Sequence, residues 1–333
     1  MAENPSSLKS NRLGIGMHSY AFHWSAARSG NARTRFKSAF EFLEYCCGLG
    51  AGGVQVGLGI LPTAEAKRFR ARAESGGVFL EGQTSLPREA ADVPRFEAEV
   101  ATVAACGANV MRSALLSGRR YETFDSQKAF QEFASKAWTA LKLSEPIAKK
   151  HRVRLAIENH KDWLAAEFVD LLRRISSEYV GVCVDVGNNI SLLEDPVEVV
   201  ETLAPFAVSS HLKDMGVQEY ADGFFLSEVP LGQGILDLPR LVATLKRANP
   251  AIRLNLEMMT RDPLPIPCLT EKYWATMPTV PARRLALALA MVKANPPRQP
   301  LPRMTGKTPD EQLQFEDENV RRCLAHAREN LQL

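Results

Sequence analysis

Short runs of aliphatic and β-branched residues alternate with helical patterns along most of the chain, and this alternation limits the possible folds more than any other feature. The strand-like runs cover residues 13–20, 52–57, 78–83, 109–115, 153–160, 180–188, 207–214 and 252–259. Helical patterns occupy 36–50, 62–77, 92–106, 126–150, 164–177, a segment from 196, 237–248 and 281–294. Strands that alternate with helices predict a parallel sheet. Eight such units indicate an α/β protein with a single (β/α)8 TIM barrel rather than a doubly wound sheet.

Composition divides the chain into three parts. Residues 1–12 form a polar N-terminal tail, residues 13–295 hold the predicted barrel, and residues 296–333 combine a proline-rich segment with a last helical pattern. Apolar residues recur on one stripe of that pattern, at Leu313, Phe315, Val320, Cys323, Leu324 and Leu331. We expect a C-terminal helix that packs on the outside of the barrel or takes part in a homo-oligomer.

Net charge, hydropathy, cysteine spacing and the lack of a phosphate-binding motif limit the partners and the location that we expect. Lys and Arg number 41 against 38 Asp and Glu, so the net charge of +3 predicts no nucleic-acid or membrane partner. No apolar run reaches the length of a membrane span. The six cysteines form no CxxC pair, which favours reduced thiols in a cytoplasmic protein. No Gly-rich phosphate-binding motif opens a helix, so we expect a small-molecule substrate rather than a nucleotide.

Four consecutive strand-like runs each end on a residue that can bind a metal. These residues are Glu158, Asp185, His211 and Glu257. The active sites of TIM barrels lie at the C-terminal ends of the strands, so the four side chains should meet at one rim. Strand alternation places the polar residues on the inside of the barrel, where unpaired carboxylates would be costly. The sequence therefore predicts one bound divalent cation, with Mn²⁺ preferred and Mg²⁺, Co²⁺ or Zn²⁺ as alternatives.

Five stretches give the sequence a family resemblance. They are IENH (157–160), VCVDVGN (182–188), SSHLKD (209–214), VPLGQGILD (229–237) and LNLEMM (254–259). With them the chain resembles the sugar phosphate isomerase/epimerase superfamily of xylose-isomerase-like barrels over about residues 13–295. The resemblance implies a metal held by the four residues above. It also implies that Glu158 and Glu257 act as the acid/base pair.

The chemistry implied is that of a metal-dependent isomerase or epimerase of a sugar or keto-sugar, in which a carboxylate moves a proton through a metal-stabilised enediolate. The alternative on the same scaffold is a lyase: a dehydratase, a 3-keto-glycoside eliminase or a 3-oxo-acid decarboxylase. Two departures from the family pattern argue against assigning the activity of a ketohexose 3-epimerase. Asn188 stands where a His is usual, and Lys213 is followed by no Arg.

Two further functions are less favoured by the sequence. An endonuclease IV-like repair enzyme would need more histidines than the six present. A binding barrel without activity would be expected to lose a metal ligand, and none is lost.

Other polar residues near the strand ends are candidates for substrate binding. They are His160, Arg112, Lys213, Gln83 and Asn188. We also expect two long loops, at 212–235 and 258–280, to form a lid over the barrel mouth. Aromatic residues such as Tyr220, Phe225 and Trp274, and the basic residue Arg261, would then face a sugar-sized substrate.

Overall fold

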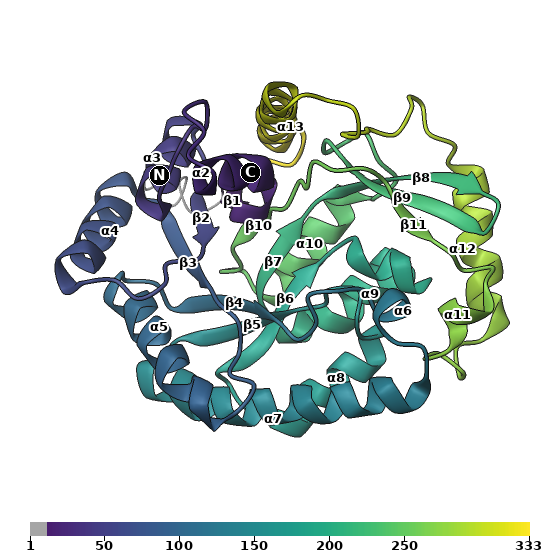
Figure 1. The fold of residues 1–333 in the computed structure, drawn as a ribbon, viewed down its shortest axis with the longest axis horizontal. Helices are drawn as coiled ribbons and strands as arrows, with labels where there is room; N and C mark the ends of the chain where they lie inside the picture. The colour runs from purple at the N-terminus through teal and green to yellow at the C-terminus, as the bar shows by residue number, and fades with distance from the viewer. Residues whose placement is uncertain (1–11) are drawn as a thin grey trace.

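The computed structural model describes residues 12–333, and its centre is a closed barrel of eight parallel strands (Figure 1). Residues 1–11, most of the expected polar tail, lie outside the described part. The strand order around the barrel is β1-β10-β7-β6-β5-β4-β3-β2. The barrel strands are β1 (Gly14–Gly16), β2 (Gly53–Val56), β3 (Phe79–Gln83), β4 (Val110–Ala114), β5 (Arg154–Glu158), β6 (Val180–Asp185), β7 (Ala207–Leu212) and β10 (Leu254–Leu256). The predicted (β/α)8 barrel is confirmed.

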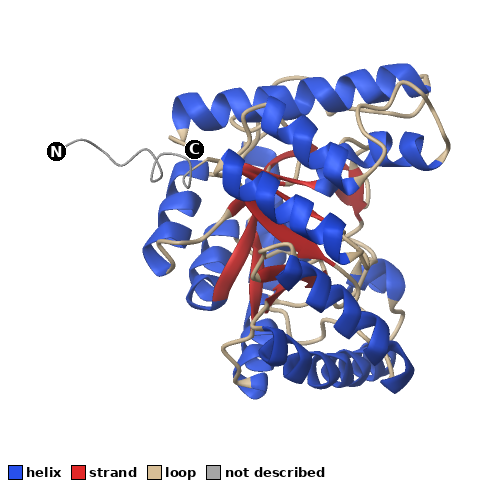
Figure 2. Cartoon of the chain, turned by 90° about the vertical axis from the view of Figure 1, so that its left-hand side faces the viewer, coloured by secondary structure: helices blue, strands red, loops and turns tan. Residues whose placement is uncertain are grey.

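Helices surround the strands, as Figure 2 shows. They are α3 (Ala39–Gly48), α4 (Thr63–Gly76), α5 (Val93–Ala105), α7 (Gln127–His151), α8 (Ala165–Ile175), α9 (Pro196–Leu203) and α10 (Leu238–Ala248). Local capping explains several of their ends. Asp195 accepts hydrogen bonds from the backbone N–H groups of Val197 and Glu198 at the start of α9. Gly77 ends α4 with a φ of 57°, a left-handed conformation that glycine adopts at little cost.

The first strand-like run is only partly a strand. The prediction of a strand over 13–20 is wrong beyond Gly16, because the chain turns there into a 3-10 helix, η1 (Met17–Tyr20), and then α2 (Ala21–Arg28). The Ser19 hydroxyl donates to the backbone carbonyl of Leu256 at 2.9 Å, which ties this turn to β10. Short elements elsewhere are η2 (Ala90–Asp92), α6 (Arg120–Thr123), η3 (Asn188–Leu192), η4 (Ala204–Phe206) and α11 (Glu271–Trp274).

The segment 212–235, expected to be a loop, contains a β-hairpin. β8 (Asp214–Tyr220) and β9 (Gly223–Val229) pair antiparallel, and β11 (Leu264–Ile266) adds a third strand. The hairpin turns at Ala221-Asp222, between the paired residues Tyr220 and Gly223. The aromatic residues expected in a lid do not line the barrel mouth. Phe224 and Tyr273, for example, belong to a second apolar core beside this sheet.

The two last helices pack against different parts of the molecule. α12 (Ala282–Ala294), expected to close the barrel, packs against β8 and β9 instead. α13 (Pro309–Asn330) lies beside α2 (Figure 1) and places Val320, Cys323, Leu324 and Ala327 in the main core. The predicted C-terminal helix is therefore confirmed, and it shares its core with the barrel. The division of the chain at residue 295 stays a prediction.

The described residues bear on two expectations, one about membrane-spanning helices and one about the cysteines. None of the described helices is both long and apolar enough to span a membrane. All six cysteines are free thiols, and Cys47 is the only one of them that is not buried.

Candidate functional site

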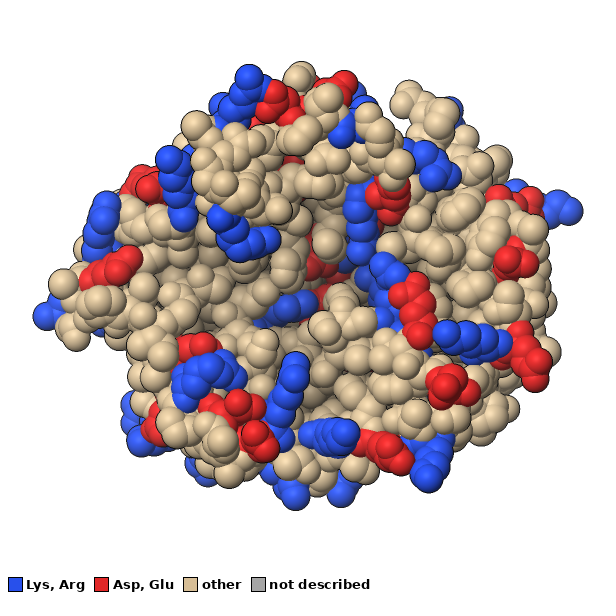
Figure 3. All heavy atoms as spheres, in the orientation of Figure 1, with Lys and Arg blue, Asp and Glu red and all other residues tan. Residues whose placement is uncertain are grey.

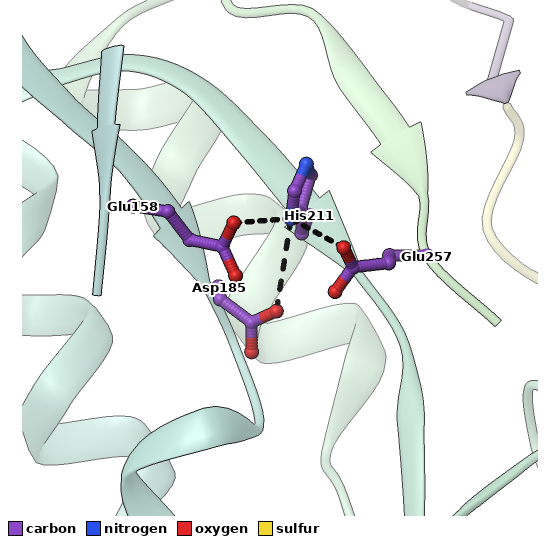
Figure 4. A group of neighbouring side chains, drawn as sticks. All are labelled: Glu158, Asp185, His211 and Glu257. Carbon is purple, nitrogen blue, oxygen red and sulfur yellow. Dashed lines mark ion pairs between the residues drawn. The ribbon is translucent and has the colours of Figure 1, made fainter. Parts of the chain in front are cut away.

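The structure brings together the four strand-end residues that the sequence singled out (Figure 4). Glu158 ends β5, Asp185 ends β6, His211 lies in β7 and Glu257 directly follows β10. Asp185 and His211 are direct partners in the register of β6 and β7, so their side chains project side by side. One possible ligand atom from each residue lies within 4.8 Å of those of the others, and all four residues are buried.

His211 is oriented as a metal ligand would be. Its Nδ1 atom has no hydrogen-bond partner and lies 3.4 Å from Glu158, 3.8 Å from Asp185 and 3.3 Å from Glu257. A buried ring nitrogen without a partner, facing three carboxylates, fits a site for a divalent cation. The donor set of one nitrogen and three carboxylates matches that reading, because hard to borderline divalent ions prefer oxygen and imidazole ligands.

Charges in the cluster compensate one another. Burial alone would raise the pKa of the Glu158 carboxyl, but Arg112 and His211 hold that pKa well below its usual range. Burial acts on Glu257 in the same way, and His211 and Lys213 keep the pKa of its carboxyl well below the usual range. For Asp185 burial prevails, and its pKa is raised although Lys213 opposes the shift. Two of the three carboxylates are thus held ionised, the form that binds a metal.

Gln55, a residue of β2 that the sequence analysis missed, fixes the tautomer of His211. The Gln55 Nε2 donates to the Glu81 carboxylate at 3.0 Å, so its Oε1 faces the His211 Nε2 at 2.7 Å. An amide oxygen only accepts, so Nε2 carries a proton, and the neutral form of the ring has its lone pair on Nδ1, on the side of the three carboxylates, where a metal would bind. Ser209 and Asn255 also donate to Glu81, which holds this buried network in place.

Replacing Gln55 with Leu should weaken metal binding by about 10–100-fold, because the His211 ring would lose the acceptor that sets its tautomer. Titration of the metal-free protein with Mn²⁺ measures the effect. The matched control is Gln218→Leu, at an exposed position of β8, which should bind Mn²⁺ like the wild type. Unchanged affinity in Gln55→Leu would contradict the assigned tautomer.

Glu257 connects the cluster to a cavity of about 690 Å³ at the barrel mouth, and it also lines that cavity. His18, a cavity residue on η1, lies with its Nδ1 at 3.1 Å from the Glu257 Oε1. A carboxylate accepts, so His18 donates from Nδ1, and its Nε2 accepts from the Gln83 amide at 3.1 Å. The ammonium of Lys213 lies 2.6 Å from the other oxygen of Glu257 and 2.6 Å from Asp185.

Glu158 is held on both of its carboxylate oxygens. The Arg112 guanidinium donates from Nε to Oε2 at 2.7 Å and contacts the same oxygen through Nη2. The Asn188 amide donates to Oε1 at 2.9 Å. Unlike Glu257, Glu158 does not line the cavity, whereas Arg112 does.

The remaining candidates for substrate binding are at or near the cavity. Gln83 and His160 line it, whereas Asn188 and Lys213 do not and instead contact the metal cluster, Asn188 at Glu158 and Lys213 at Asp185 and Glu257. The His160 Nδ1 donates to the backbone carbonyl of Leu116 at 3.0 Å. Burial lowers the pKa of His160 to about 4, so the ring is neutral near pH 7 and its Nε2 can accept a hydrogen bond.

Three cations that line the cavity, Arg119, Lys161 and Arg261, were not predicted to bind substrate. Arg261, expected only as part of a lid, lines the cavity and pairs with the buried Glu228 at 3.0 Å. Lys161 also lines it and was missed entirely. No local pattern marks Lys161, although its place three residues beyond Glu158 at the end of a barrel strand is a signal that could have been used.

Comparisons with known proteins agree with the barrel fold. The chain is 26% identical over 241 residues to a 3-oxo-isoapionate decarboxylase of Pectobacterium atrosepticum, covering 70% of this chain and 81% of the relative. A solved D-psicose 3-epimerase superposes with a TM-score of 0.60 at 15% identity, covering 95% of this chain and 98% of that one. A xylose isomerase-like protein of Mycobacterium smegmatis, solved in complex with magnesium, gives 0.55 at 13% identity and covers 85% and 99%. Residues 43–276 match the xylose isomerase-like TIM barrel family, and the chain belongs to that family.

Proposed function

We propose that this chain is a metal-dependent isomerase or epimerase that moves a proton at the carbon beside the carbonyl group of a sugar or keto-sugar. The observation that carries the proposal is the position of Glu257, which belongs to the buried metal cluster and also lines the cavity. A carboxylate at this border can reach a substrate that is held against the metal.

Different residues would carry out proton transfer, metal binding and substrate binding. Glu257 takes the proton from carbon, and His18 donates to the Glu257 carboxylate and holds it at the cavity. Glu158, Asp185, His211 and Glu257 would hold the ion, for which we favour Mn²⁺ over Mg²⁺, Co²⁺ or Zn²⁺. A bound divalent ion would supply a Lewis acid that polarises the substrate carbonyl. His160 and Gln83 are proposed to bind substrate hydroxyls.

One observation favours a lyase as the second candidate. Glu158 does not line the cavity, which leaves Glu257 as the single carboxylate of the cluster that does. Epimerisation with two carboxylate bases needs a second one at the cavity, whereas a lyase can work with one. The relative that is a decarboxylase supports the same alternative.

Product analysis in D2O tests the proposal and separates the two candidates. Metal-loaded protein is incubated with a panel of ketoses, 3-keto-glycosides and 3-oxo sugar acids, and the products are resolved by mass spectrometry. An isomerase or epimerase gives a product that differs in mass from the substrate only by the deuterium taken up at carbon in place of hydrogen. A lyase gives products that have lost water, a glycoside leaving group or CO2. No product from any member of the panel would contradict both candidates.

A further inference from the structure

Lys161 is a buried cation that has no carboxylate partner. It is only 2% exposed, and none of the ion pairs among the described residues includes it. Its Nζ donates to the side-chain oxygen of Asn188, a neutral group. The carboxylates of the neighbourhood are already paired, Asp185 with Lys213 and Glu228 with Arg261. A buried charge without a counter-ion is costly, so this ammonium is a place where an anion would be stabilised.

The backbone holds Lys161 in this position under strain. Its φ of 61° lies in the left-handed region, which is unusual for a residue with a side chain. The backbone carbonyl of Lys161 accepts from the Arg120 N–H at 3.0 Å, and the next residue, Asp162, accepts from the N–H groups of His160 and Trp163. Strain of this kind is found at functional sites more than elsewhere.

The surroundings of Lys161 are basic on the side of the cavity. Lys161, Arg112, Arg119 and Arg261 line it. Figure 3 shows Lys and Arg side chains at the central hollow, with acidic atoms deeper inside. Burial, together with the nearby charges of Lys213 and Arg261, lowers the pKa of Lys161 to about 8. An anion beside the ammonium would reverse that shift, since an opposite charge favours the charged form.

We propose that Lys161 binds an anionic group of the substrate, a carboxylate or a phosphate, so that the site selects a sugar acid or a sugar phosphate over a neutral sugar. The inference deepens the proposed function and rests on it for the nature of the reaction. Asn188 supports this role, because its side-chain oxygen accepts from Lys161 and lies 3.5 Å from the Nζ of Lys213, while its amide donates to Glu158. Asn188 therefore links the proposed anion site to the metal cluster.

Calorimetric titration with three matched probes tests the proposal. D-ribose is neutral, D-ribonate carries a carboxylate, and D-ribose 5-phosphate carries a phosphate. The wild type should bind at least one of the two anions about tenfold more tightly than ribose, because hydrogen bonds to charged groups are the stronger ones. The anion that is preferred identifies the group recognised. Lys161→Met should lose the preference, and Lys161→Gln, which keeps a donor for Asn188, should lose it as well.

The control is Arg240→Met, at an exposed residue of α10 that pairs with Glu201 and does not line the cavity, which should keep the preference of the wild type. Equal affinity for the three probes in the wild type, including no measurable binding of any of them, would overturn the proposal. A preference that survives in a folded Lys161 variant would overturn it too. Titrations are run with and without Mn²⁺, and Mn²⁺ binding is measured separately. These measurements distinguish a failure of the metal site from a failure of the anion site.

Discussion

Glu257→Gln should lower kcat by at least about 100-fold while the protein stays folded. Glutamine has the size of glutamate but cannot take up a proton from carbon, and it is a poorer metal ligand. Its amide can still meet some of the contacts that Glu257 makes with His18 and Lys213, so the barrel should keep its shape. Turnover of the substrate found in the product screen measures the effect, and a thermal melt checks the fold.

The control for this substitution is Glu122→Gln. Glu122 lines the same cavity but pairs with Arg119 at the rim and belongs to no metal cluster. We expect its kcat to stay near that of the wild type. Activity near the wild-type level in Glu257→Gln would contradict the acid/base role and would move the proton transfer to another residue.

His211→Ala should reduce the affinity for Mn²⁺ by at least about 100-fold, the upper end of the effect seen when only a supporting residue is lost. The imidazole is the one nitrogen donor in the cluster, and its Nδ1 faces all three carboxylates. Without the imidazole, the negative charge of the three buried carboxylates would be less well compensated. The loss of the ligand therefore also affects the charge balance of the site. Titration with Mn²⁺ followed by calorimetry gives the affinity.

The matched control is His151→Ala, at the end of α7, where the ring lies 3.4 Å from Glu97 and precedes β5, at the opposite end of that strand from Glu158. Its Mn²⁺ affinity should equal that of the wild type. Full metal occupancy in His211→Ala would show that the ion is held elsewhere.

The barrel and the metal cluster could be predicted from the sequence because both follow from local patterns. The period of the apolar residues distinguishes strands from helices, and the residue at the end of each strand points to the rim. Glu158, Asp185, His211 and Glu257 needed no knowledge of distant contacts beyond the parallel order of their strands.

The parts that were missed depend on contacts between residues far apart in the sequence. Nothing local shows that the apolar stripe of α13 shares the main core while α12 covers the small sheet. Gln55 resembles any polar residue inside a strand until His211 and Glu81 are placed around it. No local pattern shows that Lys161 contacts Asn188 and lines the cavity. The hairpin is different, since the Asp222-Gly223 dipeptide where its turn ends is a local signal for a turn.

The metal content of the purified protein tests the central claim most directly. Elemental mass spectrometry before and after chelation, with the melting temperature followed in parallel, gives the answer in one preparation. The account predicts about one divalent ion per chain, lost with EDTA, and a melting temperature that rises again when Mn²⁺ is restored, because a ligand that binds only the folded state stabilises it. No bound metal, together with no stabilisation by any divalent ion, would contradict the account.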